Sequence, residues 1–197
     1  MREISCASPK KILTIMLTSD DVRRAFKTVS EWDTKDRKGV YGQGVLKDAS
    51  GVGACGEISV GKFLGVVPAL EYCEGGAATD LAYRGYSLEV KTRDARAWPP
   101  KRQPDLWWIK STDRGGKHIL KDSVVFRSPY IVCCALRRDA IAYWVDIHGW
   151  CRVADIPREM HTTRYGKWLN YHITTNLLED PRLLPEIGWA KQVKFFS

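Results

Sequence analysis

The sequence predicts a single domain of the α/β class, in which helices precede a run of strands that build a mixed sheet. Its 197 residues suffice for one substantial core but not for two comfortable ones. Residues 19–32 place apolar side chains at helical spacing, whereas Tyr130–Leu136 is a continuous apolar run typical of a central strand. Helices followed by consecutive strands indicate an α/β or α+β domain, and we expect the α/β form.

The N-terminal third predicts one strand and two helices. Ile12–Leu17 is read as a strand, and Thr18 or Ser19 can cap the helix at 19–32. Residues 35–53 form a polar, glycine-rich segment that we expect to be a loop. A second helix is expected over 52–65, ending near Gly65 and before Pro68.

Four residues of this second helix fall four positions apart and therefore line one ridge: Gly53, Glu57, Gly61 and Gly65. Glycine inside a helix costs about 1 kcal/mol relative to alanine, so another factor must favour these residues. We expect the glycine ridge to let the helix press close to the sheet and to carry Glu57 toward it.

Strands dominate the remainder of the chain. A hairpin is expected from 78–83 and 86–93, and further strands are expected at 105–110 and 140–147. The tail holds a basic, aromatic stretch, His161–Tyr171. A short helix is then expected around 175–179.

Composition points to a basic intracellular protein. The formal net charge is +8 and the pI is about 9.2, a balance that favours contact with a polyanion. No apolar run is long enough to cross a bilayer, and we see no secretory signal. The six cysteines contain no Cys-x-x-Cys pair, which favours buried free thiols in a reducing cytoplasm over a zinc site.

The hairpin carries the chemistry. If Arg84 and Gly85 form a two-residue turn, Leu81 faces Leu88 and Asp80 faces Glu89. One face then carries the core residues Leu81, Tyr83, Tyr86, Leu88 and Val90. The other face carries Asp80, Ala82, Ser87, Glu89 and Lys91. Two opposed carboxylates repel each other unless a divalent cation lies between them, and magnesium prefers such oxygen ligands. The alternative is an exposed charged face on which Lys91 only offsets the acids.

The spacing of Asp80, eight residues, and then Glu89-Val90-Lys91 resembles the motif of the PD-(D/E)xK nuclease superfamily. The preceding segment, with Gly56-Glu57 and Phe63-Leu64-Gly65, is similar to the acidic helix of many members. The later His148-Gly149-Trp150 resembles small phage-encoded members. Thr79 stands where the motif has proline, and there is no convincing Gln-x-x-x-Tyr element of the exonuclease branch.

The resemblance implies a restriction-endonuclease-like mixed β-sheet flanked by helices. It further implies a DNA endonuclease of phage-type DNA processing that depends on Mg²⁺, for which Mn²⁺ substitutes. The metal would be held by Asp80, Glu89 and the carbonyl of Val90; Lys91 would position the attacking water, and Glu57 would hold an outer water or a second metal.

DNA is the expected partner, and a homodimer is possible. Candidate contacts to phosphate are the basic residues Arg84, Arg93, Arg96, Lys101, Arg102, Arg164 and Lys167. The open alternatives are a Holliday-junction resolvase or exonuclease, a catalytically inactive nucleic-acid-binding protein of the same fold, and a structural phage protein.

Overall fold

The computed structural model describes residues 12–36, 43–68, 70, 80–95, 106–110, 128–157, 161–162 and 169–187. Within these ranges, only the backbone is described for 28–36, 43–50, 106–110, 161–162 and 169–172.

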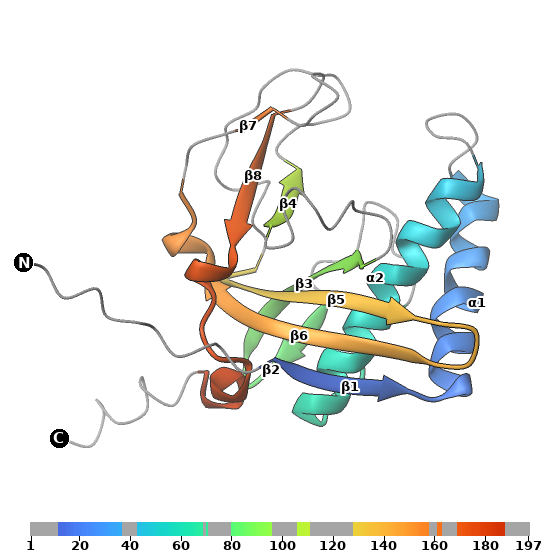
Figure 1. Ribbon diagram of the computed structural model, residues 1–197, viewed down its shortest axis with the longest axis horizontal. Coiled ribbons are helices and arrows are strands. Elements are labelled where there is room, and N and C mark those ends of the chain that lie inside the picture. The colour runs from blue at the N-terminus through green and yellow to red at the C-terminus, as the bar shows by residue number, and fades with distance from the viewer. Residues whose placement is uncertain are drawn as a thin grey trace, which may run out of the picture.

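The main sheet has five strands in the order β1-β6-β5-β3-β2 (Figure 1). The strands are β1 (Leu13–Leu17), β2 (Leu81–Tyr83), β3 (Tyr86–Asp94), β5 (Tyr130–Arg138) and β6 (Tyr143–Arg152). Strand β3 pairs in parallel with β5, whereas the other neighbours pair antiparallel. The expected mixed sheet and the central position of 130–136 are therefore confirmed.

A second sheet of three strands lies beside one end of the first (Figure 1). It pairs β4 (Leu106–Lys110) with β8 (Leu169–Thr174), and β8 with β7 (His161–Thr162). The strand expected at 105–110 is present, but it does not belong to the main sheet. The expected helix at 175–179 is only the 3-10 turn η2 (Thr175–Leu177), because Glu179 pairs with Trp150 instead.

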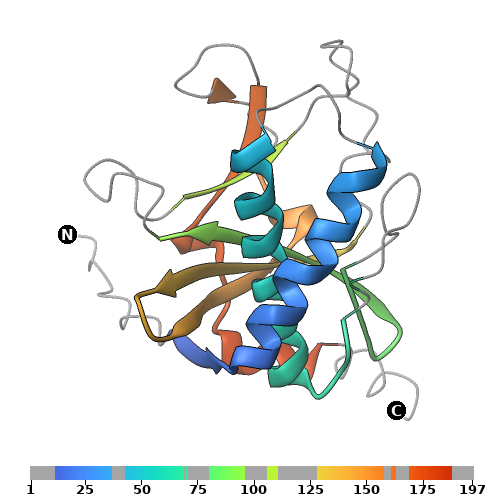
Figure 2. The same cartoon turned by 90° about the vertical axis from the view of Figure 1, so that its right-hand side faces the viewer.

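Both helices cover the same face of the main sheet (Figure 2). They are α1 (Ser19–Asp36) and α2 (Gln43–Leu64). α1 extends four residues beyond the expected end at residue 32, and α2 begins nine residues before the expected start at residue 52. The prediction of a loop over 35–53 is therefore wrong for residues 35–36 and 43–53. None of the helices in the described part of the chain is long and apolar enough to span a membrane.

Local hydrogen bonds fix the helix ends. Thr18 caps α1: its hydroxyl accepts from the Asp21 amide at 3.2 Å, and its own amide donates to the Asp21 carboxylate at 2.7 Å. Helix α2 ends at Leu64, and the next residue, Gly65, has a φ of +70°, a conformation that favours glycine. The Val66 amide then donates to the Gly61 carbonyl at 2.9 Å, which closes the helix end.

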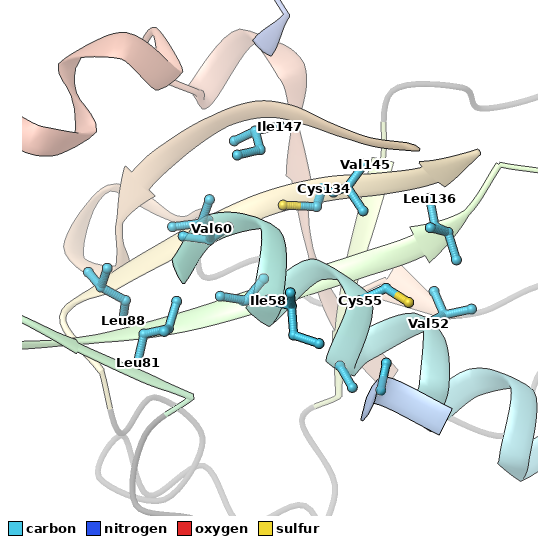
Figure 3. Packing of buried hydrophobic residues seen from close by; sticks show 14 of the residues in the cluster. Val52, Cys55, Ile58, Val60, Leu81, Leu88, Cys134, Leu136, Val145 and Ile147 are labelled. Carbon is cyan, nitrogen blue, oxygen red and sulfur yellow. The ribbon is translucent and has the colours of Figure 1, made fainter. Parts of the chain in front are cut away.

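The larger core lies between α2 and the main sheet (Figure 3). Helix α2 contributes Val52, Cys55, Ile58 and Val60, which face buried residues of β2, β3, β5 and β6. A smaller cluster on the opposite face contains residues of β5, β6, β8 and two 3-10 turns, η1 (Val153–Asp155) and η2, together with residues that directly follow these turns. A third 3-10 turn, η3 (Pro181–Glu186), packs against β6 and adds Leu184 to the larger core.

The cysteines that the structure describes are buried free thiols, as expected. They are Cys55, Cys133, Cys134 and Cys151. Burial raises the pKa of Cys55 and of Cys151 to about 12, and it raises the pKa of Cys133 and Cys134 strongly. These thiols therefore stay protonated at neutral pH and act as small apolar side chains.

Candidate active site

The β2–β3 hairpin has the register that the sequence predicts. Arg84 and Gly85 form the two-residue turn, both with positive φ (+49° and +78°), which matches the twist of the strands. Leu81 pairs with Leu88 and Tyr83 pairs with Tyr86. Leu81, Leu88 and Val90 are buried, so the predicted division of the hairpin into a core face and a polar face is confirmed.

Asp80 does not continue the strand, contrary to the predicted pairing of Asp80 with Glu89. Among the described residues the β2–β3 ladder ends at the pair of Leu81 and Leu88. Beyond it, the Val90 amide donates to the Asp80 carboxylate at 2.7 Å. A short acidic side chain competes in this way with a backbone partner. Because the amide and carbonyl of one strand residue point to the same side, the Val90 carbonyl also faces this edge.

Helix α2 carries Glu57 to the same edge of β3. The close contact is made by Gly56, where a Cβ atom would lie 1.7 Å from the Thr92 hydroxyl oxygen. The expected glycine ridge is wrong as an account of this contact: Gly53 and Gly65 have open space around them, and Gly61 lies against the Val66 carbonyl of the helix end. The sequence signal for the contact was the glycine directly before Glu57.

Glu57, Asp80 and Glu89 lie near enough to one another for the charges of Asp80 and Glu89 to influence the pKa of Glu57. Burial, together with the nearby Asp80 and Glu89 carboxylates, raises the pKa of Glu57 to about 8, while Lys91 opposes the shift. Burial also raises the pKa of Asp80 to about 6, with Glu89 adding to the rise and the Val90 amide opposing it. The Lys91 ammonium donates to the Glu89 carboxylate. If all three acids ionise, Lys91 neutralises only one of their negative charges.

This donor set fits a hard divalent cation. Its candidate ligands are carboxylate oxygens and the Val90 carbonyl, which are the oxygen donors that Mg²⁺ and Mn²⁺ prefer. A cation would also offset the burial and the mutual repulsion that together raise the pKa of Glu57 and of Asp80. In the described part of the chain, no three His, Cys, Asp or Glu side chains form a ready-made metal centre. Each of the two acids uses one oxygen in a hydrogen bond, Glu89 with Lys91 and Asp80 with Val90, so a cation would compete with the Lys91 ammonium for Glu89.

Two of the seven basic residues that the sequence suggested as phosphate contacts can be placed. Arg93 lies two residues after Lys91 on β3 and therefore shares its face. Arg84 lies at the hairpin tip, with its guanidinium 5.2 Å from the centre of the Tyr83 ring. Five of the suggested contacts lie outside the described residues: Arg96, Lys101, Arg102, Arg164 and Lys167.

The Gly56 contact generates a prediction with an internal control. Gly53→Ala, on the same helix in open space, should stabilise the protein by about 0.5–1 kcal/mol because alanine favours helix. Gly56→Ala should instead destabilise it by about 1–3 kcal/mol, because the new Cβ overlaps Thr92. Urea denaturation of both variants measures the difference. Equal effects of the two substitutions would show that α2 does not press on β3 at Gly56.

A second prediction concerns stability and pH without metal. The folded pKa values of about 8 for Glu57 and about 6 for Asp80 exceed the ordinary values of 4.5 and 3.8. The folded protein therefore binds more protons than the unfolded chain in this window. The stabilising contribution of the protonated acids is complete below about pH 4 and is lost as pH rises through 6 and 8.

Urea denaturation in chelator should accordingly give a free energy of unfolding that falls from pH 5 to pH 8.5. In Glu57→Gln the fall should be smaller, because the amide cannot ionise. Adding Mg²⁺ at pH 8.5 should restore more stability to the wild type than to the variant. Identical pH profiles for the two proteins would show that the Glu57 carboxyl does not have the raised pKa expected beside Asp80 and Glu89.

Comparison with known proteins assigns this chain to no family. No family model, no curated protein and no solved structure matches it. What the protein does must therefore be inferred from the acids and the lysine at the edge of β3.

Proposed function

We propose that this protein is a divalent-metal-dependent nuclease that hydrolyses DNA phosphodiester bonds, with a restriction-endonuclease-like core. The observation that carries the proposal is the convergence of three acids and one lysine at the β3 edge, beside a strand carbonyl. Three acids held close together without a matching number of cations destabilise a fold, so a functional cation site accounts for them better than a structural one.

The residues have distinct parts in the proposed site. Asp80, Glu89 and the Val90 carbonyl would hold the cation, and Glu57 would bind an outer water or a second cation. When bound, the cation supplies positive charge against the phosphate oxygens and acidifies water. Lys91, whose ammonium reaches the Glu89 carboxylate, would orient the attacking water and stabilise the charge that develops on the phosphate.

The order of elements supports the same proposal. Helix α2, which carries Glu57, precedes the β2–β3 hairpin and then its parallel neighbour β5, with β4 between β3 and β5 in the chain. The helix and these three strands β2, β3 and β5 share one core. A net charge of +8 favours a polyanionic substrate. A protein of this fold that only binds DNA would not need Asp80, Glu89 and Lys91 together.

A cleavage assay tests the proposal. Supercoiled plasmid, a linear duplex and a four-way junction are incubated with Mg²⁺, with Mn²⁺ and with chelator. Nicked or linear plasmid in either metal, and none in chelator, is expected for an endonuclease. Shortened linear duplex alone would indicate an exonuclease, and selective junction cutting a resolvase. Intact substrates in all three conditions would leave the protein without the proposed activity.

Lys91→Ala separates chemistry from binding. Cleavage should fall by about two orders of magnitude or more, as when one electrostatic stabiliser is removed, while DNA affinity stays within about twofold. The matched control is Lys62→Ala, because Lys62 also pairs with a carboxylate, that of Asp21, but on the α1–α2 side of the protein. Plasmid cleavage and fluorescence anisotropy measure the two quantities. Cleavage by Lys91→Ala at the rate of the control would remove Lys91 from the mechanism.

A further inference from the structure

Part of the main sheet has an open face that continues from the candidate site. Cross-strand partners point to the same side of a sheet, so the registers place Arg93, Ala135, Asp146 and Thr14 in one row across β3, β5, β6 and β1. The next row holds Arg137, Trp144 and Met16. Lys91 and Glu89 lie on the same face, two and four residues before Arg93 respectively.

The second sheet covers only one half of this face. The smaller core cluster that fills the covered half contains Ile131, Cys133 and Ile173. Toward the β5–β6 turn, Met16 is 65% exposed and the Arg137 side chain is 50% exposed. In Figure 1, β1, β6 and β5 lie in front of the helices, and no described element crosses them near that turn.

A hydrogen-bonded network centred on the nearly buried Asp146 holds one arginine in place on the open half. Asp146 accepts from the Arg137 Nε at 2.5 Å and from its Nη2 at 2.9 Å, and the Thr14 hydroxyl donates to the same carboxylate at 2.7 Å. The Arg137 guanidinium thereby lies 5.8 Å from the centre of the Trp144 ring. This bidentate ion pair, with an Asp146 carboxylate that Thr14 also holds, leaves the Arg137 side chain little conformational freedom.

We propose that the Arg137–Trp144 pair is a stacking platform for a single DNA strand that leaves the site at the β3 edge. Single-strand-binding surfaces combine basic side chains that follow the phosphates with aromatic and guanidinium planes that stack on bases. Here Arg93 supplies the basic link between Lys91 and the platform. This inference rests on the proposed function only for the claim that the bound strand is substrate.

Charge decides between the candidate occupants of this face. A second copy of the chain would bring another strongly basic surface to Arg93 and Arg137, since each copy carries a net charge of +8. A nucleic-acid strand brings the opposite charge and planar groups. The Arg137–Trp144 contact also contributes little to the stability of the sheet, because an exposed cation–aromatic pair is weak; binding of a ligand accounts for it better.

The test measures binding in chelator, so that it does not depend on cleavage. Labelled single-stranded oligonucleotide and a duplex of the same length are titrated with the full chain, and anisotropy reports affinity. Trp144→Leu and Arg137→Gln should each weaken single-strand binding about tenfold, the size expected for losing one stacked base. Trp144→Tyr, which keeps an aromatic plane, should stay within about threefold of the wild type.

Arg152→Gln is the matched control, since Arg152 is also an exposed arginine on β6 that pairs with an aspartate, Asp155, but it carries no tryptophan contact in the described structure. It should leave binding unchanged, and circular dichroism should show all variants folded. Wild-type affinity in Trp144→Leu would overturn the platform, as would equal losses in Trp144→Leu and Trp144→Tyr. A wild-type dimer that Trp144→Leu dissociates would assign the face to a second copy and overturn it too. Absence of metal-dependent cleavage with this binding pattern intact would refute only the proposed function.

Discussion

The contact between Gly56 and Thr92 determines where α2 lies on the sheet, and the position of the acids follows from it. A methyl group at Gly56 would overlap the Thr92 hydroxyl, so the helix can lie this close only because residue 56 has no side chain. At that distance Val52, Ile58 and Val60 reach the core, where each fully buried side chain contributes about 1.5–3 kcal/mol. Glu57, the residue after Gly56, is carried along to the edge of β3. Core packing therefore holds an acid where electrostatics alone would repel it.

Among the residues that the structure describes, no strand pairs with the edge of β3 at the point where chemistry is proposed. Unpaired strand edges are normally blocked or charged, because their amides and carbonyls invite another strand. Here the Asp80 carboxylate accepts a hydrogen bond from the Val90 amide, so this backbone donor is satisfied. The Val90 carbonyl points to the same side of β3 and would face a cation bound there. The departure of Asp80 from the strand thus blocks the edge to another strand and supplies ligand oxygens at once.

The sequence predicted the features that depend on local periodicity. Alternation along the β2–β3 hairpin and the Arg84-Gly85 turn were sufficient for its register, and the apolar run at 130–136 was sufficient for the central strand. Other features depend on contacts that periodicity does not contain. Leu106 pairs with Thr174, far along the chain, so the second sheet left no local pattern. Asp80 fits the alternation of a strand, but a side-chain hydrogen bond to Val90 removes it from the ladder. The ridge of glycines was visible in the sequence, yet only the position of the Thr92 side chain on β3 shows that Gly56 is the glycine in contact.

The central claim is that Asp80 and Glu89, with the Val90 carbonyl, form a divalent-cation site at the edge of β3. Crystals of the metal-free protein soaked in Mn²⁺ and measured near the manganese absorption edge test it most directly, because the anomalous signal locates the ion independently of any activity. We predict one anomalous peak within about 2.0–2.3 Å of oxygens of Asp80 and Glu89, with Lys91 displaced from Glu89. Full soaking that leaves this edge without a peak, with Lys91 still bound to Glu89, would contradict the account.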